Sequence, residues 1–188
     1  KKKLEEKNLI NTMIKDGLWD VFNDYHMGIT AENVASKWEI SRQDQDDFAL
    51  SSQVKAEKAK NEKKFNNEIV PIILKSKDGD NQFDTDEHPR EGMTLDRLKK
   101  LKPSFKANGT VTAGNSSGTN DGAAAVVLMN ENQAKKRNLQ PLAKIVSWAT
   151  CGVDPSLMGS GPIPASREAL KKACWKITDL DLIESNEA

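Results

Sequence analysis

Asn186 and Glu187 stand directly after the predicted strand 179–185, and their side chains suit oxyanion or acid–base chemistry. In α/β folds the carboxyl ends of strands commonly carry the functional site. An asparagine at such an end can hold a water or donate to a developing oxyanion. The same Asn-Glu pair would also suit the cap of a following helix, so the sequence leaves both interpretations open.

Two other side chains could contribute a proton or a positive charge. His26 follows a cluster of apolar and aromatic residues that could line an apolar pocket with one polar tip, although core packing is the simpler interpretation. The members of this cluster are Leu18, Trp19, Phe22 and Tyr25. Arg90 could pair with a phosphate, but the acidic stretch "DTDEHPRE" could equally hold it in a surface salt bridge.

The segment "GTVTAGNSSGTNDGAAAVVLM" (109–129) has Asp121 as its only charged residue. Its glycines do not form GxGxxG, and no GKS or GKT follows, so a phosphate loop is not supported. Small polar groups and an open backbone would suit an extended, amide-containing ligand. These groups belong to Asn115, Ser116, Ser117 and Asn120. The alternative for this segment is a packed turn that leads into a buried strand. A second stretch with few side chains, "MGSGPIP" (158–164), is better interpreted as a structural turn.

Composition excludes several classes of function. The charges balance at 28 Lys+Arg against 28 Asp+Glu, which does not favour nucleic-acid or anionic-membrane binding. No apolar stretch approaches the roughly 20 residues of a membrane span. Cys151 and Cys174 are too few for a disulfide framework and lack zinc spacing, so we expect packing residues in a reducing, intracellular protein.

The first part of the chain is predicted as a module of short elements. After a solvated charged run, residues 1–8, short helical pieces separated by turns are expected up to Gly28. Thr30 is expected to cap a helix to about Glu39, and Ser41 with Asp44 forms a capping box for a helix to about Lys60. That helix carries a narrow apolar stripe of Phe48, Ala49, Val54 and Ala59. Then come a strand over 68–74 at a sheet edge, a Lys-Asp-Gly-Asp turn, a return strand and a helix capped by Thr94.

From residue 120 onward the pattern changes to alternating strands and helices. Strands are predicted at 121–129, 142–150 and 179–185, and helices at 130–140 and 163–175, where Pro164 lies near the first turn. This β-α-β-α-β order favours a layered α/β architecture. The chain lacks an initiator Met and halts just after a strand, so we expect a fragment.

Several long stretches resemble the thiolase family, in particular the biosynthetic acetyltransferases of cytosolic and bacterial kind. The resemblance covers nearly the whole chain from about residue 9, in the family's order and spacing. The stretches are "YHMGITAENVA" (25–35), "EIVPIIL" (68–74), the segment 109–129, "PLAKIVSWATCGVDP" (141–155), "MGSGPIPA" (158–165) and "SNEA" (185–188).

The resemblance implies the layered α-β-α-β-α thiolase fold, with residues 1–119 as the loop domain that covers coenzyme A. Residues 120–140 would end the N-terminal thiolase domain, and 141–188 would begin the C-terminal one. It also implies condensation of two acetyl-CoA to acetoacetyl-CoA, or the reverse thiolysis, through an acetyl-cysteine. Coenzyme A is then a substrate and no cofactor is bound permanently. A cytoplasmic homo-oligomer, dimer or tetramer, in lipid metabolism would follow, without nucleic acid or membrane.

The residue roles follow from the same resemblance. Asn186 matches the family's water- or oxyanion-holding asparagine. The remaining matches line the coenzyme A site, which extends from the acyl group to the nucleotide. In sequence order they are Leu18, His26, Met27, Arg90, Ala113, Gly114, Ser117, Met158 and Ala188.

The chain departs from the family in two ways. Arg97 stands where related thiolases often carry a small serine near the adenine. The nucleophile cysteine motif, the GHP histidine and the CxG cysteine do not occur in these 188 residues, and neither Cys151 nor Cys174 matches them. Two alternatives therefore stand beside the enzyme: a thiolase-derived acyl-CoA-binding module without catalysis, and a stable domain with no ligand.

Overall fold

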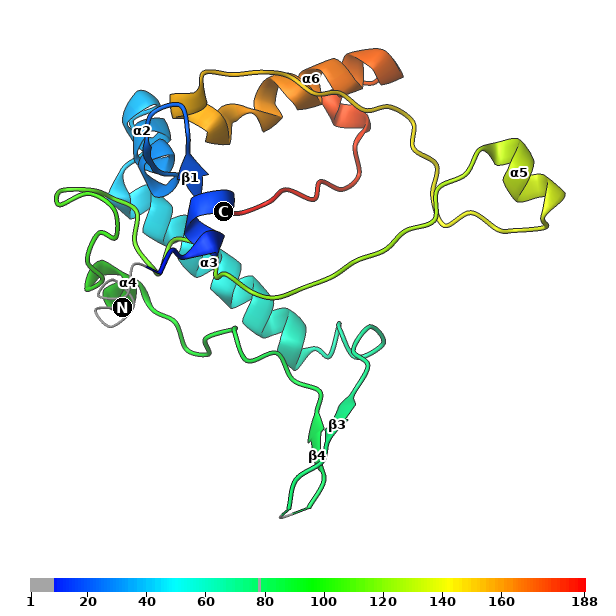
Figure 1. Ribbon diagram of the computed structural model, residues 1–188, viewed down its shortest axis with the longest axis horizontal. Coiled ribbons are helices and arrows are strands. Elements are labelled where there is room, and N and C mark those ends of the chain that lie inside the picture. The colour runs from blue at the N-terminus through cyan, green and yellow to red at the C-terminus, as the bar shows by residue number, and fades with distance from the viewer. Residues whose placement is uncertain (1–8, 78) are drawn as a thin grey trace. The chain divides into compact units, whose positions relative to one another are not determined.

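The computed structural model describes residues 9–77 and 79–188 (Figure 1). The chain divides into two compact units, Lys1–Gly118 with Glu187–Ala188, and Thr119–Asn186. The charged run 1–8 and Asp78 of the predicted turn lie outside the described residues. The boundaries predicted at 119/120 and 140/141 stay predictions. No described helix combines the length and the apolar character that crossing a bilayer requires.

The first unit begins with a π-helical turn, η1 (Met13–Gly17), and a small antiparallel hairpin. In it β1 (Trp19–Asp20) pairs with β2 (Tyr25–His26). The expectation of helical pieces alone is wrong here. The buried Asp20 carboxylate accepts from Phe22 N at 2.9 Å and Asn23 Nδ2 at 2.7 Å, and this Asx-type turn reverses the chain.

Helix α2 (Gly28–Lys37) starts before the predicted cap. Thr30 is not its N-cap, because the buried Thr30 hydroxyl donates to the Met27 carbonyl instead of accepting from a free N–H. Helix α3 (Arg42–Asn61) confirms the capping box, with Ser41 accepting from Asp44 N and Asp44 accepting from Ser41 N. The predicted stripe on α3 is not buried, since Phe48 and Val54 are exposed and Asp46 is the helix's buried residue.

The capping box makes part of the stability depend on pH. Hydrogen bonds from the Ser41 hydroxyl and main chain hold the pKa of Asp44 below its ordinary value of 3.8. In the acid range the unfolded chain therefore binds more protons than the folded one, so this stabilisation is present above about pH 4 and lost below it. Urea midpoints of wild type and Asp44→Asn between pH 3 and 6 should converge toward pH 3. A constant difference across this range would contradict the assignment.

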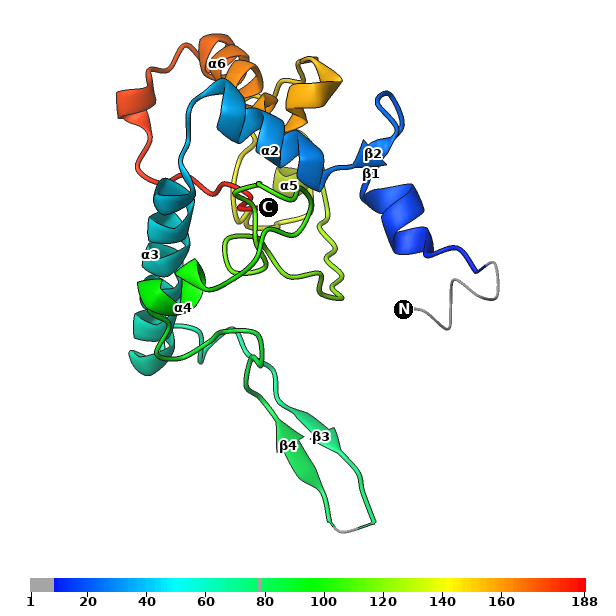
Figure 2. The same ribbon diagram turned by 90° about the vertical axis from the view of Figure 1, so that its left-hand side faces the viewer.

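The predicted strand and return strand are confirmed, although the first is shorter than the expected 68–74. Strand β3 (Ile72–Leu74) pairs antiparallel with β4 (Asn81–Phe83), with Ile72 opposite Phe83. Pro71 lies just before β3, where its missing N–H does not interrupt the ladder. Figures 1 and 2 both show this hairpin projecting beyond the end of α3. Helix α4 (Leu95–Lys99) begins at the predicted cap, Thr94.

The core of the first unit is small and partly polar. Its buried apolar side chains are Ala35, Leu98 and Val111. Its buried polar residues are Asp20, Thr30, Glu32, Asp46 and Thr112. An isolated bridge joins Pro103 to Thr112, and Ser104 N donates to Val111 O at 2.9 Å. Strand β1, the helices α2, α3 and α4 and the segment 103–117 therefore contribute to a core that contains three carboxylates.

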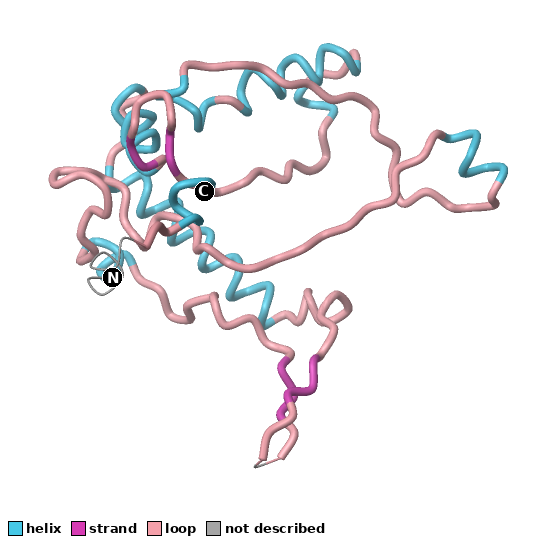
Figure 3. The backbone as a smooth tube through the Cα atoms, in the orientation of Figure 1, coloured by secondary structure: helices cyan, strands magenta, loops and turns pink. Residues whose placement is uncertain are grey.

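The second unit contains α5 (Glu131–Lys136), η2 (Pro155–Ser160), α6 (Pro162–Ala173) and η3 (Ile177–Asp179). The two predicted helices are confirmed, although α5 is shorter than expected. The three strands expected at 121–129, 142–150 and 179–185 are wrong for this chain, which forms no ladder there among its described residues (Figure 3). A strand needs a neighbour to accept its hydrogen bonds. The apolar side chains of these three segments are exposed as well, for example Val127 at 86% and Leu182 at 92%.

Candidate functional site

Three predicted site residues meet at the β1–β2 hairpin. Met27 N donates to Leu18 O at 2.8 Å, and His26 pairs with Trp19 across the strands. Gly28 N donates to His26 Nδ1 at 2.9 Å. A neutral His26 therefore carries its proton on Nε2, which makes that nitrogen a hydrogen-bond donor. The predicted aromatic cluster is looser than expected, because Phe22 is 79% exposed.

Phe105 covers one face of His26 and was not found by sequence reasoning. The two rings stack with centroids 4.6 Å apart and an interplanar angle of 26°. A Cβ on Gly28 would lie 2.4 Å from the Phe105 ring, so glycine is required for this approach. Because Ser104, next to Phe105, bonds to Val111, the stacked pair connects the hairpin to the segment 109–117.

The segment 109–117 folds as a loop whose own polar side chains hold it in shape. The Asn115 side chain accepts from Thr112 N at 2.7 Å and donates to Thr110 O at 3.0 Å. Ser116 Oγ donates to Thr112 O at 2.8 Å. The expectation that Asn115 and Ser116 would offer free groups to a ligand is therefore wrong. Ala113 and Ser117 are exposed, and no described residue hydrogen-bonds to the Ser117 hydroxyl.

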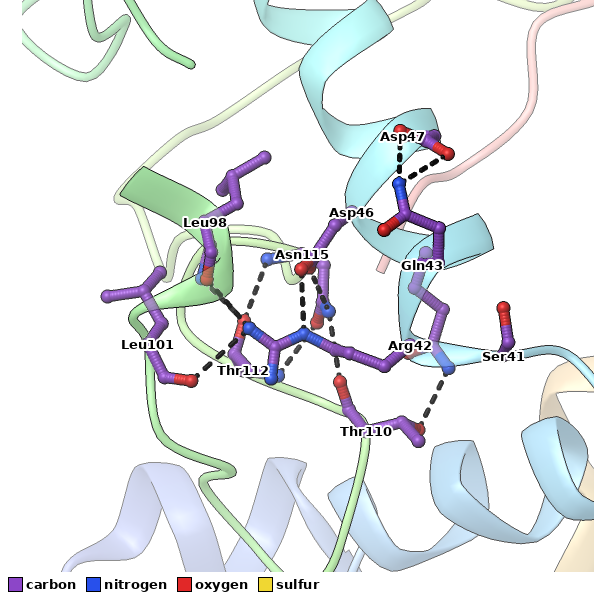
Figure 4. Close-up of polar contacts among 12 residues, drawn as sticks. Ser41, Arg42, Gln43, Asp46, Asp47, Leu98, Leu101, Thr110, Thr112 and Asn115 are labelled. Atoms are coloured by element: carbon purple, nitrogen blue, oxygen red, sulfur yellow. Dashed lines mark hydrogen bonds and ion pairs between the residues drawn. The ribbon is translucent and has the colours of Figure 1, made fainter. Parts of the chain in front are cut away.

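An ion pair between buried Asp46 and partly exposed Arg42 supports the packed side of the loop (Figure 4). Asp46 Oδ1 accepts from Asn115 Nδ2 at 3.0 Å, and Asp46 Oδ2 accepts from Arg42 Nε at 2.8 Å. The same guanidinium donates to the carbonyls of Leu98, at 2.7 Å, and Leu101, at 3.2 Å. Helix α3 thereby ties the loop to helix α4.

Gly114 faces this support. A Cβ there would lie 2.4 Å from Leu101 Cδ1 and 2.6 Å from Leu98 Cδ2, so a larger residue would push the loop away from α4. The loop therefore has a packed side, against α4, and an exposed side, which carries Ala113 and Ser117.

The loop also contacts the end of the sequence. Ser117 N donates to the main-chain oxygen of Ala188 at 2.7 Å, so two predicted site residues are in direct contact. Ser52 on α3 donates to Glu187 Oε2 at 3.0 Å and fixes the same segment. Met158, in η2, and Asn186 belong to the second unit, where both are exposed.

Arg90 lies near the other end of the loop. The ring of His88 occupies the place of a side chain on Gly118, where a Cβ would be 2.5 Å from His88 Cε1. Arg90 N donates to Gln53 Oε1 at 3.3 Å. The alternative of a surface salt bridge is not formed, because no described carboxylate pairs with the Arg90 guanidinium. The neighbouring Glu91 is paired with Lys60 at 2.7 Å, and this hydrogen bond lowers the pKa of Glu91.

The other candidate groups carry no site. Cys151 and Cys174 are exposed free thiols, so the expectation that they pack in the interior is wrong for this chain. Among residues 9–77 and 79–188, no three His, Cys, Asp or Glu side chains gather as a metal site requires.

Comparison with known proteins gives two family matches. The family model described as "Thiolase, N-terminal domain" matches residues 1–132, and "Thiolase, C-terminal domain" matches 139–188. Among curated relatives, an acetyl-CoA acetyltransferase of Paracoccus denitrificans is 60% identical over 186 residues, covering 99% of this chain and 48% of that protein. The chain thus spans about half the length of the curated relatives it matches.

Solved structures agree in fold. The acetyl-CoA acetyltransferase of Syntrophomonas wolfei superimposes with a TM-score of 0.89 at 45% identity, over 96% of this chain and 45% of that one. A human mitochondrial 3-ketoacyl-CoA thiolase in complex with CoA gives 0.83 at 47% identity, over 92% and 43%. The predicted thiolase fold is confirmed, although the segments 121–129, 142–150 and 179–185 form no ladder among the residues that the structure describes.

Proposed function

Because this chain belongs to the thiolase family, we propose that it is the coenzyme-A-binding part of an acetyl-CoA acetyltransferase. The intact protein would condense two acetyl-CoA to acetoacetyl-CoA and CoA, or catalyse the reverse thiolysis. One thioester transfers its acetyl group to a cysteine sulfur and releases CoA. A second cysteine takes a proton from the methyl group of another acetyl-CoA, and the resulting carbanion attacks that acetyl carbonyl and displaces the first cysteine as a thiolate. These cysteines and the catalytic histidine would come from outside the 188 residues.

The observation that carries the proposal is the exposed side of the 113–117 loop. This side carries no large side chain and offers the Ser117 hydroxyl, which has no hydrogen-bond partner among the described residues, while the opposite side is held by Asn115 and Asp46. The long, amide-containing arm of coenzyme A needs close backbone approach and a few fixed polar groups. Leu18 and Met27 would add apolar surface along the same arm, and His26 Nε2 would add a donor.

Arg90 would take the nucleotide end of the ligand. Its guanidinium is exposed and unpaired among the described residues, and a planar guanidinium suits phosphate oxygens. Since Lys60 already occupies Glu91, the acid next to Arg90 does not compete for it. Ala188, in contact with Ser117, would lie at the pantetheine end.

Asn186 and Met158 would act at the reacting thioester of the intact protein. The amide of Asn186 would hold a water or donate to the thioester oxyanion, and stabilisation of this kind is commonly worth several kcal/mol in a transition state. Met158 would lie beside the acyl group. Both assignments rest on the family resemblance of "SNEA" and "MGSGPIPA".

Three further properties of the intact protein rest on that resemblance alone. It would assemble as a homodimer or homotetramer, act in the cytoplasm in lipid metabolism, and use coenzyme A as a substrate without a permanently bound cofactor.

The test is an assay of the intact protein that carries these residues. Acetyl-CoA is supplied alone, and formation of acetoacetyl-CoA and free CoA is followed together with CoA binding by calorimetry. Binding with turnover is expected. Binding without turnover would favour the non-catalytic module, and absence of both would overturn the proposal.

A further inference from the structure

We propose that Glu32, on helix α2, is a positioning residue that holds the 109–117 loop in its ligand-binding shape; this proposal rests on the proposed function. Glu32 is 5% exposed and accepts hydrogen bonds from three donors of the loop. Thr110 N lies 2.9 Å from Oε1 and 3.0 Å from Oε2, and Val111 N lies 2.9 Å from Oε1. Thr110 Oγ1 lies 3.0 Å from Oε2.

The environment of Glu32 shows that its partner is the loop backbone. Among the described residues no cation pairs with this carboxylate, so main-chain N–H groups and one hydroxyl compensate its burial. A Cβ on Gly109 would lie 2.2 Å from Glu32 Oε1, so the carboxylate reaches the backbone through a gap that only glycine leaves. The loop is therefore built around this side chain.

Glu32 acts at one end of the loop, and Asp46 acts at its middle. Glu32 fixes Thr110 and Val111, two residues before Ala113, whereas Asp46 reaches the loop through Asn115. Val111 is buried and its carbonyl accepts from Ser104 N, so the position of this residue also sets the segment next to Phe105. Without Glu32, Thr110 keeps its contacts with Asn115 and Gln45, but the N–H groups of Thr110 and Val111 lose their acceptor, so the stretch leading into Ala113 is held less tightly.

The expected consequence lies in binding more than in chemistry. A loop that samples several shapes binds with an affinity reduced by the fraction of time it spends in the competent one. Once coenzyme A is bound the loop is ordered again, and the reacting groups, which lie elsewhere, are unchanged. Loss of Glu32 should therefore raise KM for acetyl-CoA and leave kcat nearly constant.

The experiment compares Glu32→Ala, Glu32→Gln and Glu32→Asp in the intact protein. Ala removes every bond, and we expect Kd for CoA and KM for acetyl-CoA to rise about tenfold with kcat within about threefold. Gln keeps one oxygen for Thr110 N and Val111 N, and its amide can donate to Thr110 Oγ1, so it should remain within about threefold of wild type. Asp is one methylene shorter and should fall between them, which keeps the test valid if the Ala variant does not fold.

The control is Asp44→Ala, which removes the α3 capping box without touching the loop, and it should leave KM and Kd unchanged. Amide exchange of residues 110–117 should be faster in Glu32→Ala than in wild type without ligand, and equal when both are saturated with CoA.

The proposal would be overturned if Glu32→Ala kept the Kd and KM of the wild type, or if it lowered kcat at constant KM. If the wild type does not bind CoA, the proposed function itself fails. If Ser117→Trp abolishes binding but Glu32→Ala does not weaken it, the role of Glu32 alone fails.

Discussion

Replacing Ser117 with tryptophan should weaken coenzyme A binding to the intact protein by about 100-fold or more. The Ser117 side chain is exposed and its hydroxyl has no partner among the described residues, so the indole would stand over the loop instead of entering the core. It would then occupy the surface along which the pantetheine arm is proposed to lie. The loop is held by its own hydrogen bonds and cannot move aside to relieve this clash. Calorimetric titration of CoA measures the loss.

The matched control is Ser51→Trp, a serine that is exposed on helix α3 and distant from the loop in sequence. It adds the same bulk, and the affinity should remain that of the wild type. Thermal melts of both variants should stay near wild type. Equal CoA affinity in Ser117→Trp and wild type would contradict the placement of the ligand along the 113–117 loop.

Replacing Asp46 with alanine should lower the free energy of unfolding by about 3 kcal/mol, no more than the lower end of the range for breaking a buried ion pair, because Asp46 is buried but Arg42 is partly exposed. The Asp46 side chain is 1% exposed and joins Arg42 to Asn115. The loss stays at that lower end because Arg42 keeps its bonds to the Leu98 and Leu101 carbonyls. Urea unfolding, followed by the loss of helical signal, measures the change.

Asp47 offers a control at the next position of the same helix. It is exposed and, within residues 9–77 and 79–188, accepts only from the Gln43 side chain, so Asp47→Ala should change the free energy of unfolding by less than about 0.5 kcal/mol (Figure 4). A similar loss in both variants would mean that helix propensity at these positions, and not the buried network, determines stability.

Local signals in the sequence predicted the elements that depend on near neighbours. The Ser41–Asp44 capping box, the Thr94 cap and the hairpin on either side of the Lys-Asp-Gly-Asp turn are each complete within a few residues. Such interactions form whatever the rest of the chain does, so the residue pattern alone identifies them.

Long-range interactions were missed because their residues look ordinary in sequence. Glu32 and Asp46 occupy helical positions that usually face solvent, and their partners in the loop lie far along the chain. The signal that could have revealed them is Gly109, together with the scarcity of charge after it, because such a loop needs polar support from other elements. The strands predicted in the second unit failed for a different reason: apolar patterns predict a strand, but pairing needs a neighbouring strand.

The most direct measurement is a crystal structure of the intact protein with coenzyme A. We expect the pantetheine arm along the exposed side of the 113–117 loop, with a polar atom within about 3 Å of Ser117 Oγ and the phosphates toward Arg90. Coenzyme A bound on another face, with the Ser117 hydroxyl and Ala113 still facing solvent, would contradict the account.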